Sequence, residues 1–147
     1  MTDGVLGPGE GLRFGNDPSA YTAVFKLLSS QTEGQLCLEE EWVPVGQGIP
    51  PHRHLTRLEF FYVLEGTLQF IVGEDTVAAS AGTSVFVPKG ARHAYSNVSQ
   101  APARQLALWA PGGFEAMYEG IAEASQANTL DWDKFVELWR QVDTEPA

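Results

Sequence analysis

Residues 46–66 read GQGIPPHRHLTRLEFFYVLEG, and this stretch carries the strongest indications of fold and chemistry in the chain. His52 and His54 are separated by one residue in a strand-like context. Because residues i and i+2 of a strand point to the same face, both imidazoles can reach one point in space. Glu59 opens the apolar run that follows. The stretch therefore predicts ligand groups carried on neighbouring β-segments.

The rest of the chain up to Trp109 has the same character. From about Leu12 onward, short apolar or alternating runs are separated by Gly, Pro, Asn and Asp. Many short strands at regular spacing predict an all-β sandwich or barrel. The clearest runs are 21–28, 36–43, 59–64, 67–72, 83–87, 92–97 and 104–109. The turn at Glu65-Gly66-Thr67 predicts a tight hairpin that pairs residues 62–64 with 68–70.

The tail changes from strand-like to helical spacing. Two apolar stripes recur with the period of a helix: Phe114, Met117, Tyr118 and Ile121, and then Trp132, Phe135, Val136, Trp139 and Val142. The spacing predicts two helices joined by residues 125–130. We expect their apolar stripes to cover the outside of the barrel or to form a subunit contact.

Composition excludes two classes of partner. The chain has 147 residues, of which 44% are hydrophobic and 19% charged, as expected for one globular domain. Its net charge is −10, from 19 acidic and 9 basic residues. Such a charge repels phosphate backbones and anionic membrane surfaces, so we expect neither nucleic acid nor membrane as a partner. The simplest interpretation of the acidity is that it keeps the protein soluble.

Cysteine usage and the N-terminus indicate the compartment. Cys37 is the single cysteine, so no intrachain disulfide can form. The first residues, 1–5, lack the basic stretch and apolar run of a signal peptide. No uninterrupted apolar segment approaches the length of a membrane span. The sequence therefore predicts a cytoplasmic location, which a lone thiol fits without proving it.

A metal site is the main chemical hypothesis. The three histidines of the chain are His52, His54 and His93, and the last opens another apolar run. Imidazole nitrogen with a carboxylate oxygen from Glu59 suits one divalent transition metal, whether Fe, Mn, Co, Ni or Zn. From His52 and His54 alone, however, an ordinary loop histidine remains the more frequent interpretation.

The glycines and prolines around these residues favour a metal site over ordinary loop histidines. Gly46 and Gly66 frame the first block, and Gly82, Pro88, Gly90 and Asn97 frame His93 in a second block. The two blocks resemble cupin motifs 1 and 2 at every defining position. The resemblance implies that His52, His54, Glu59 and His93 are metal ligands. It also implies a single cupin domain over 1–147: a double-stranded β-helix, or jelly-roll barrel, at about 12–110, with a C-terminal helical tail at about 112–143.

Strand alternation predicts which side chains surround the ligands. The side chains expected to line a substrate pocket are Phe61, Val63, Phe70, Phe86 and Tyr95. An ordinary barrel core is an equally good interpretation of these residues. Arg53 and Arg57 flank the ligands, where they would steer an anionic substrate or, more commonly, pair with acids or face solvent.

The resemblance also suggests a reaction. Residues 7–11 and 110–115 are similar to segments of bacterial single-domain cupins of the quercetin-dioxygenase-like group. This implies a metal-dependent dioxygenase, an oxidoreductase that acts on a small aromatic or enolisable molecule with O₂, with Glu59 as ligand or general base. The alternatives are an oxygen-independent isomerase, cyclase, dehydratase or decarboxylase, and a non-catalytic small-molecule-binding barrel. The resemblance further implies a homodimer, for which Trp132 and Trp139 are the expected contact residues.

Overall fold

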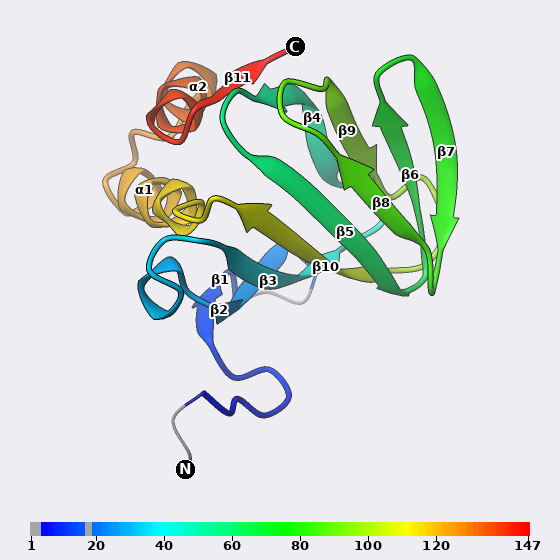
Figure 1. The fold of residues 1–147 in the computed structure, drawn as a ribbon, viewed down its shortest axis with the longest axis horizontal. Helices are drawn as coiled ribbons and strands as arrows, with labels where there is room; N and C mark the ends of the chain where they lie inside the picture. Colours follow the sequence, from blue (N-terminus) through cyan, green and yellow to red (C-terminus); the bar gives the residue numbers. More distant parts are fainter. Residues whose placement is uncertain (1–3, 17–18) are drawn as a thin grey trace.

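Two antiparallel sheets form the body of the protein, and the computed structural model describes residues 4–16 and 19–147 (Figure 1). One sheet has the strand order β1 (Leu12–Phe14), β2 (Thr22–Leu27), β3 (Cys37–Val43), β10 (Ala103–Ala110), β5 (Leu58–Glu65) and β8 (Ser84–Val87). The other has the order β11 (Thr144–Pro146), β4 (Gly48–His54), β9 (His93–Ser96), β6 (Thr67–Val72) and β7 (Asp75–Ser80). The prediction of an all-β jelly-roll barrel is confirmed.

Alternation along the strands sorts core from surface. In β5, Glu59, Phe61 and Val63 are buried, whereas Phe60 and Tyr62 point outward and are 36% and 40% exposed. The same period of two runs through β10, where every second side chain is buried. Because successive strand residues face opposite sides of a sheet, one apolar face of each sheet meets the other to form the core.

The turn at Gly66 is a corner between the sheets, so the predicted hairpin is wrong. Strand β5 pairs with β10 and β8, whereas β6 pairs with β7 and β9 in the opposite sheet. Gly66 has a φ of +75°, and a Cβ there would lie 2.7 Å from the carbonyl oxygen of Pro102. Glycine is therefore required at this corner, because a side chain would meet both backbone strain and the neighbouring loop.

The tail consists of the predicted pair of helices, α1 (Glu115–Gln126) and α2 (Trp132–Gln141), which lie side by side at one end of the barrel (Figure 1). The Asp131 carboxylate caps α2 by accepting a hydrogen bond from the Lys134 N–H at 2.8 Å. After α2 the chain returns to the barrel as β11, which pairs with β4. No helix in the described part of the chain is long and apolar enough to cross a bilayer.

The apolar stripes of these helices pack into the barrel core. Met117, Leu138 and Trp139 belong to the same buried cluster as the strand residues. Trp139 is only 2% exposed within one chain, so the prediction that it forms a subunit contact is wrong. Trp132 is 55% exposed. The homodimer itself stays a prediction.

Candidate metal centre

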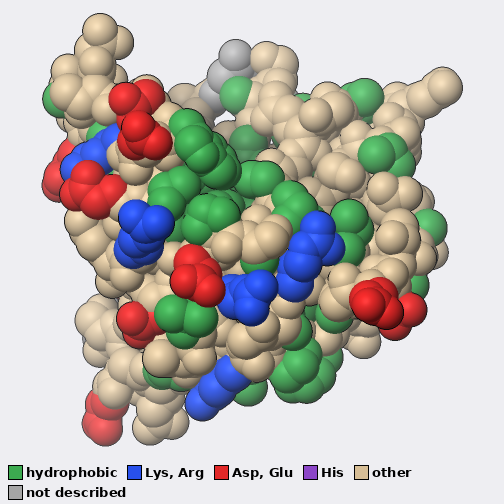
Figure 2. Space-filling model, turned by 90° about the horizontal axis from the view of Figure 1, so that it is seen from above, with side chains coloured by type: hydrophobic (Ala, Val, Ile, Leu, Met, Phe, Trp, Pro, Cys, Tyr) green, Lys and Arg blue, Asp and Glu red, His purple; other side chains and the backbone are tan. Residues whose placement is uncertain are grey.

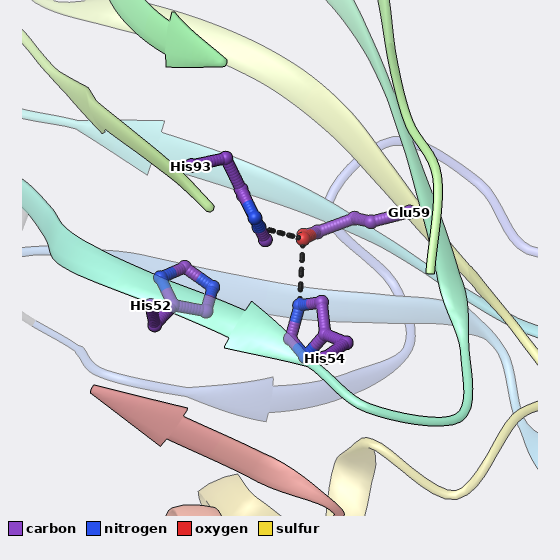
Figure 3. A group of neighbouring side chains, drawn as sticks. All are labelled: His52, His54, Glu59 and His93. Atoms are coloured by element: carbon purple, nitrogen blue, oxygen red, sulfur yellow. Dashed lines mark hydrogen bonds and ion pairs between the residues drawn. The ribbon is translucent and has the colours of Figure 1, made fainter. Parts of the chain in front are cut away.

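Four buried side chains from three strands converge near the end of the barrel that the helices cover (Figure 3). His52 and His54 come from β4, His93 from β9, and Glu59 from β5 in the opposite sheet. Their potential ligand atoms all lie within 4.8 Å of one another. His52 and His93 are direct partners in the β4–β9 register, which explains why residues 41 positions apart in sequence share a site.

Backbone carbonyl groups orient two of the imidazoles. The Nδ1 atom of His52 lies 2.9 Å from the carbonyl oxygen of Pro50, and that of His93 lies 3.0 Å from the carbonyl oxygen of Ala91. A carbonyl oxygen only accepts hydrogen bonds, so each Nδ1 carries the proton. Each neutral ring therefore keeps a free electron pair on Nε2, which is the tautomer that a metal ligand requires.

The last strand orients the third imidazole. The Nδ1 atom of His54 lies 2.7 Å from the hydroxyl oxygen of Thr144 in β11, and that hydroxyl donates to the carbonyl oxygen of Val142 at 3.1 Å. Because the threonine proton is already used, the hydroxyl accepts from Nδ1–H. Sequence reasoning did not identify Thr144, since only the pairing of β11 with β4 brings it to His54.

The contacts between the imidazoles and Glu59 indicate that a positive charge lies between them. The Nε2 atoms of His54 and His93 each lie 2.8 Å from the same carboxylate oxygen, Oε2 of Glu59 (Figure 3). In the neutral rings those nitrogens carry electron pairs, so a positive charge must sit between them and the carboxylate. A proton or a metal ion satisfies this requirement. Three imidazole nitrogens and one carboxylate oxygen form a donor set that suits a divalent transition metal.

The pKa shifts follow from the same neighbours. Burial opposes ionisation of Glu59, but the charge and hydrogen bonds of His54 and His93 outweigh it and lower the pKa to about 2. Burial, reinforced by His93, lowers the pKa of His52 to about 3. Burial also disfavours a charged His93, yet its bond to Glu59 raises the pKa overall. At neutral pH His52 is therefore uncharged and Glu59 is a carboxylate.

Aromatic rings from the tail cover the outer side of the ligands. The Trp139 ring stacks on His52 with centroids 5.0 Å apart and an interplanar angle of 24°. The Phe114 ring meets His54 edge-on at 5.3 Å. The helical stripes identified both side chains as packing residues, but the contact of Phe114 with His54 depends on how α1 docks on the barrel, and that of Trp139 with His52 on how α2 docks.

A cavity of about 820 Å³ opens beside the ligands, and both His52 and Glu59 line it. Of the predicted pocket residues, Tyr95 lines this cavity. Three others, Phe61, Val63 and Phe70, are fully buried between the sheets and are absent from its wall. Phe86 is 57% exposed on the outer face of β8, so its assignment to the pocket is wrong. Much of the cavity wall comes instead from α1 and α2.

Neither flanking arginine faces the cavity. Arg53 forms an exposed ion pair with Glu145, with 3.7 Å between Nε and Oε1. Arg57 is buried and donates from Nη1 to the carbonyl oxygen of Gly112 at 2.9 Å. The predicted pairing with an acid therefore applies to Arg53, whereas Arg57 neither pairs with an acid of the described chain nor faces solvent but is buried on a backbone carbonyl group. No histidine side chain is visible on the face of the molecule in Figure 2, in agreement with the burial of all three histidines.

A second group of polar side chains lies inside the barrel and lines part of the same cavity. We call it the carboxyl–tyrosine cluster, and its members are Tyr21, Glu39, Glu41, Tyr95 and Tyr118. Glu41 accepts hydrogen bonds from the hydroxyls of Tyr21 at 2.6 Å and Tyr95 at 2.9 Å. Glu39 accepts one from the hydroxyl of Tyr118 at 2.7 Å.

Burial and like charge shift the pKa values of this cluster upward. Burial, followed by the charge of Glu41 and a hydrogen bond with that carboxylate, raises the pKa of Glu39 well above its ordinary range. The three tyrosine pKa values are also raised, again chiefly by burial. Among the described residues, no lysine, arginine or histidine pairs with either carboxyl group. Sequence reasoning missed this cluster, although the alternation in Glu39-Glu40-Glu41 placed two acids on one face.

The sequence and the structure were each found to be similar to known proteins with this fold. Residues 40–109 match the family model described as a cupin domain. The structure is similar to a predicted oxalate decarboxylase from Thermotoga maritima, with a TM-score of 0.60, 21% identity and coverage of 62% of this chain and 80% of that one. It is also similar to the protein TT1209 from Thermus thermophilus, with a TM-score of 0.59, 27% identity and coverage of 65% and 88%.

The sequence is also similar to that of one curated relative. An uncharacterized protein of Methanocaldococcus jannaschii, MJ1618, is 29% identical over 69 residues, which are 47% of this chain. The match spans 55% of that relative, or about half of its length. The comparisons therefore support the fold and a match of residues 40–109 to the cupin domain model, and they assign no reaction to the chain.

Proposed function

We propose that this cupin-fold chain is a metal-dependent enzyme that acts on a small aromatic or enolisable molecule, with oxygenation of the quercetin-dioxygenase-like type as the leading reaction. One observation carries the proposal: a buried three-histidine, one-carboxylate group borders a large cavity with aromatic walls. Fold likeness alone would not support it, because one fold hosts many reactions.

The ligand residues would hold the metal, and the cavity would hold the substrate. His52, His54 and His93 offer Nε2 atoms, and Glu59 offers a carboxylate oxygen. A bound divalent transition metal would supply Lewis acidity and, for a redox-active ion, electron exchange with O₂. The aromatic walls would exclude water from the bound substrate. The lowered pKa of Glu59, about 2, fits a ligand better than a base, so its role as general base stays a prediction.

Oxygen-independent proton transfer is the second candidate, and the carboxyl–tyrosine cluster favours it. The hydroxyl groups of Tyr21, Tyr95 and Tyr118 belong to residues that line the same cavity as Glu59. Isomerisation, cyclisation, dehydration and decarboxylation all require such groups to move protons. These reactions need no O₂, which makes the two candidates separable by experiment.

The test loads the protein separately with Fe(II), Mn(II), Co(II) and Ni(II) and follows O₂ uptake with a flavonol and related enols. We expect uptake with at least one metal, and its loss in Glu59→Gln. The control variant is Glu74→Gln, which removes the same charge at an exposed turn. Turnover under strictly anaerobic conditions would favour the second candidate. Binding of metal and enol with no turnover under either condition would leave only a binding barrel and overturn the proposal.

A further inference from the structure

The wall of the 820 Å³ cavity has an unusual balance of chemical groups. Nine Phe, Tyr or Trp side chains line it, together with three acidic residues and a single arginine, Arg13. One of the acids, Glu59, belongs to the ligand group, and another, Asp131, caps α2. This leaves Glu41 as a buried acid that faces the cavity and serves neither of these purposes.

Glu41 lacks a cationic partner among the described residues. Both of its oxygens accept hydrogen bonds, from Tyr21, Tyr95 and Gln105, which is the pattern of a carboxylate. Arg13 does not neutralise it, because that side chain lies over the Trp42 ring at 5.8 Å. A buried charge without a counter-charge is costly, and a bound cation would remove that cost.

We propose that the Glu41 end of the cavity binds an organic ammonium group, so that the substrate class of the proposed enzyme carries a positively charged nitrogen. The identification of the bound molecule as a substrate rests on the proposed function, but binding of the ammonium group does not require a metal. The faces of aromatic rings are negative and attract cations, most strongly when water is excluded. The net charge of −10 also draws cations toward the protein.

The hydrogen-bond directions disfavour an anionic or carbonyl group at this end. Tyr21 and Tyr95 direct their hydroxyl protons to Glu41, and Tyr118 directs its proton to Glu39. In this arrangement each hydroxyl proton is directed at a carboxyl group, so none is directed at a ligand oxygen. An anion would in addition meet the carboxylate of Glu41. A neutral aromatic molecule would fill the space but leave that charge uncompensated.

The experiment uses metal-free, chelator-treated protein and two probes of nearly the same shape. Choline carries the quaternary nitrogen, and 3,3-dimethyl-1-butanol replaces that nitrogen with carbon. Binding is followed by calorimetry and by tryptophan fluorescence, because Trp109, Trp132 and Trp139 line the cavity. We expect saturable choline binding that is tighter than binding of the neutral probe by about tenfold or more.

Two variants test the assignment to Glu41. Glu41→Gln keeps the shape and removes the charge, and should weaken choline binding about tenfold while leaving the neutral probe unchanged. Glu40→Gln is the matched control, since Glu40 pairs with Arg104 away from the cavity, and should keep the choline affinity. Should Glu41→Gln fail to fold, Phe135→Leu removes one ring of the wall instead and should weaken choline binding by about threefold to tenfold. Equal affinity for the two probes, or choline binding that neither Glu41→Gln nor Phe135→Leu weakens, would overturn the inference.

A separate metal titration distinguishes this inference from the proposed function. Protein that binds choline but takes up no transition metal would contradict the proposed enzyme and keep the cation site. Protein that binds metal and shows no preference for choline would keep the enzyme and contradict the cation site.

Discussion

Glu59 and Glu39 are both buried in the same barrel, yet their pKa values move in opposite directions. Glu59 is 2% exposed and its pKa is lowered to about 2, because two imidazoles contact one of its oxygens. Glu39 is fully buried and its pKa is raised, because burial is reinforced by the charge of Glu41. Depth is similar at the two positions, so the neighbours decide which form of the carboxyl group is stable.

The two clusters also present opposite hydrogen-bonding groups to the cavity. In the ligand group, electron pairs on nitrogen converge on a point that needs a positive ion. In the carboxyl–tyrosine cluster, hydroxyl protons are already directed at carboxyl groups. The donor set of the first cluster suits a small metal ion, and we propose that the second binds a larger organic cation.

The largest expected effect concerns the ligand group. His93→Ala should lower the affinity for divalent transition metals by more than about 100-fold, because loss of an outer-shell contact alone costs about 10–100-fold. Metal content after purification and a titration of metal-free protein measure this. Glu41→Gln should leave the metal affinity within about threefold of wild type. A similar loss in both variants would show that the two clusters act as one site.

The pH dependence of stability tests the raised pKa of Glu39. An acid whose folded pKa is raised stabilises the fold below its ordinary value of 4.5, and that stability is lost as the pH rises toward the folded pKa. Glu39→Gln removes this titration. Between pH 4.5 and the raised folded pKa, we expect its unfolding free energy, relative to wild type, to rise by about 1.4 kcal/mol per pH unit, and to level off above that pKa. Urea unfolding at several pH values measures the difference, and parallel curves would contradict it.

Thr144 tests whether the C-terminal strand supports the ligands. Thr144→Val keeps the shape but removes the hydroxyl that accepts from His54 Nδ1. The ring then loses the contact that selects its tautomer, and metal affinity should fall by about 10–100-fold. Competition with a chromogenic chelator gives the affinity. Thr56→Val is the control, because that hydroxyl is exposed and bonds to Asp143 instead; it should bind metal as tightly as wild type.

The smallest effect is expected at Tyr21. Tyr21→Phe removes one donor to Glu41 and keeps the ring in the cavity wall. Loss of a hydrogen bond to a charged acceptor should lower the unfolding free energy by about 1–2 kcal/mol. Metal affinity should not change, since Tyr21 contacts none of the four ligands in the described structure. A large loss of metal binding would show coupling between the clusters.

Short-range patterns accounted for much of the barrel and, together with the resemblance to the cupin motifs, for the candidate metal centre. Alternation along residues 59–64 placed Phe61 and Val63 on the same face as Glu59, as the structure has them. The pair His52 and His54 lies on one face of β4 for the same reason. These predictions succeeded because strand geometry fixes side-chain direction over a few residues. The weakly patterned strands β7 and β11 were not predicted, since β7 is mostly exposed and β11 has three residues.

Predictions that depended on long-range pairing fared worse. The expected hairpin at Gly66 is a corner between two sheets, because β5 pairs with β10 and β8 in one sheet, whereas β6 pairs with β7 and β9 in the other. Phe86 was assigned to the pocket on an uncertain strand phase, and its register with Phe60 places it outside. Trp139 was expected to cover the outside of the barrel or to form a subunit contact, but it packs inside, on His52. An apolar stripe shows that a helix face is buried and does not show against what.

The sequence by itself determined the all-β barrel and the helical tail from local spacing, and its resemblance to the cupin motifs indicated the four residues of the candidate metal centre. Only the tertiary structure decided that the tail would close over the ligands and that Glu39 and Glu41 would meet three tyrosines from separate elements. The physical reason is that packing and pKa shifts depend on neighbours in space, and those neighbours are set by sheet register and helix docking rather than by spacing along the chain.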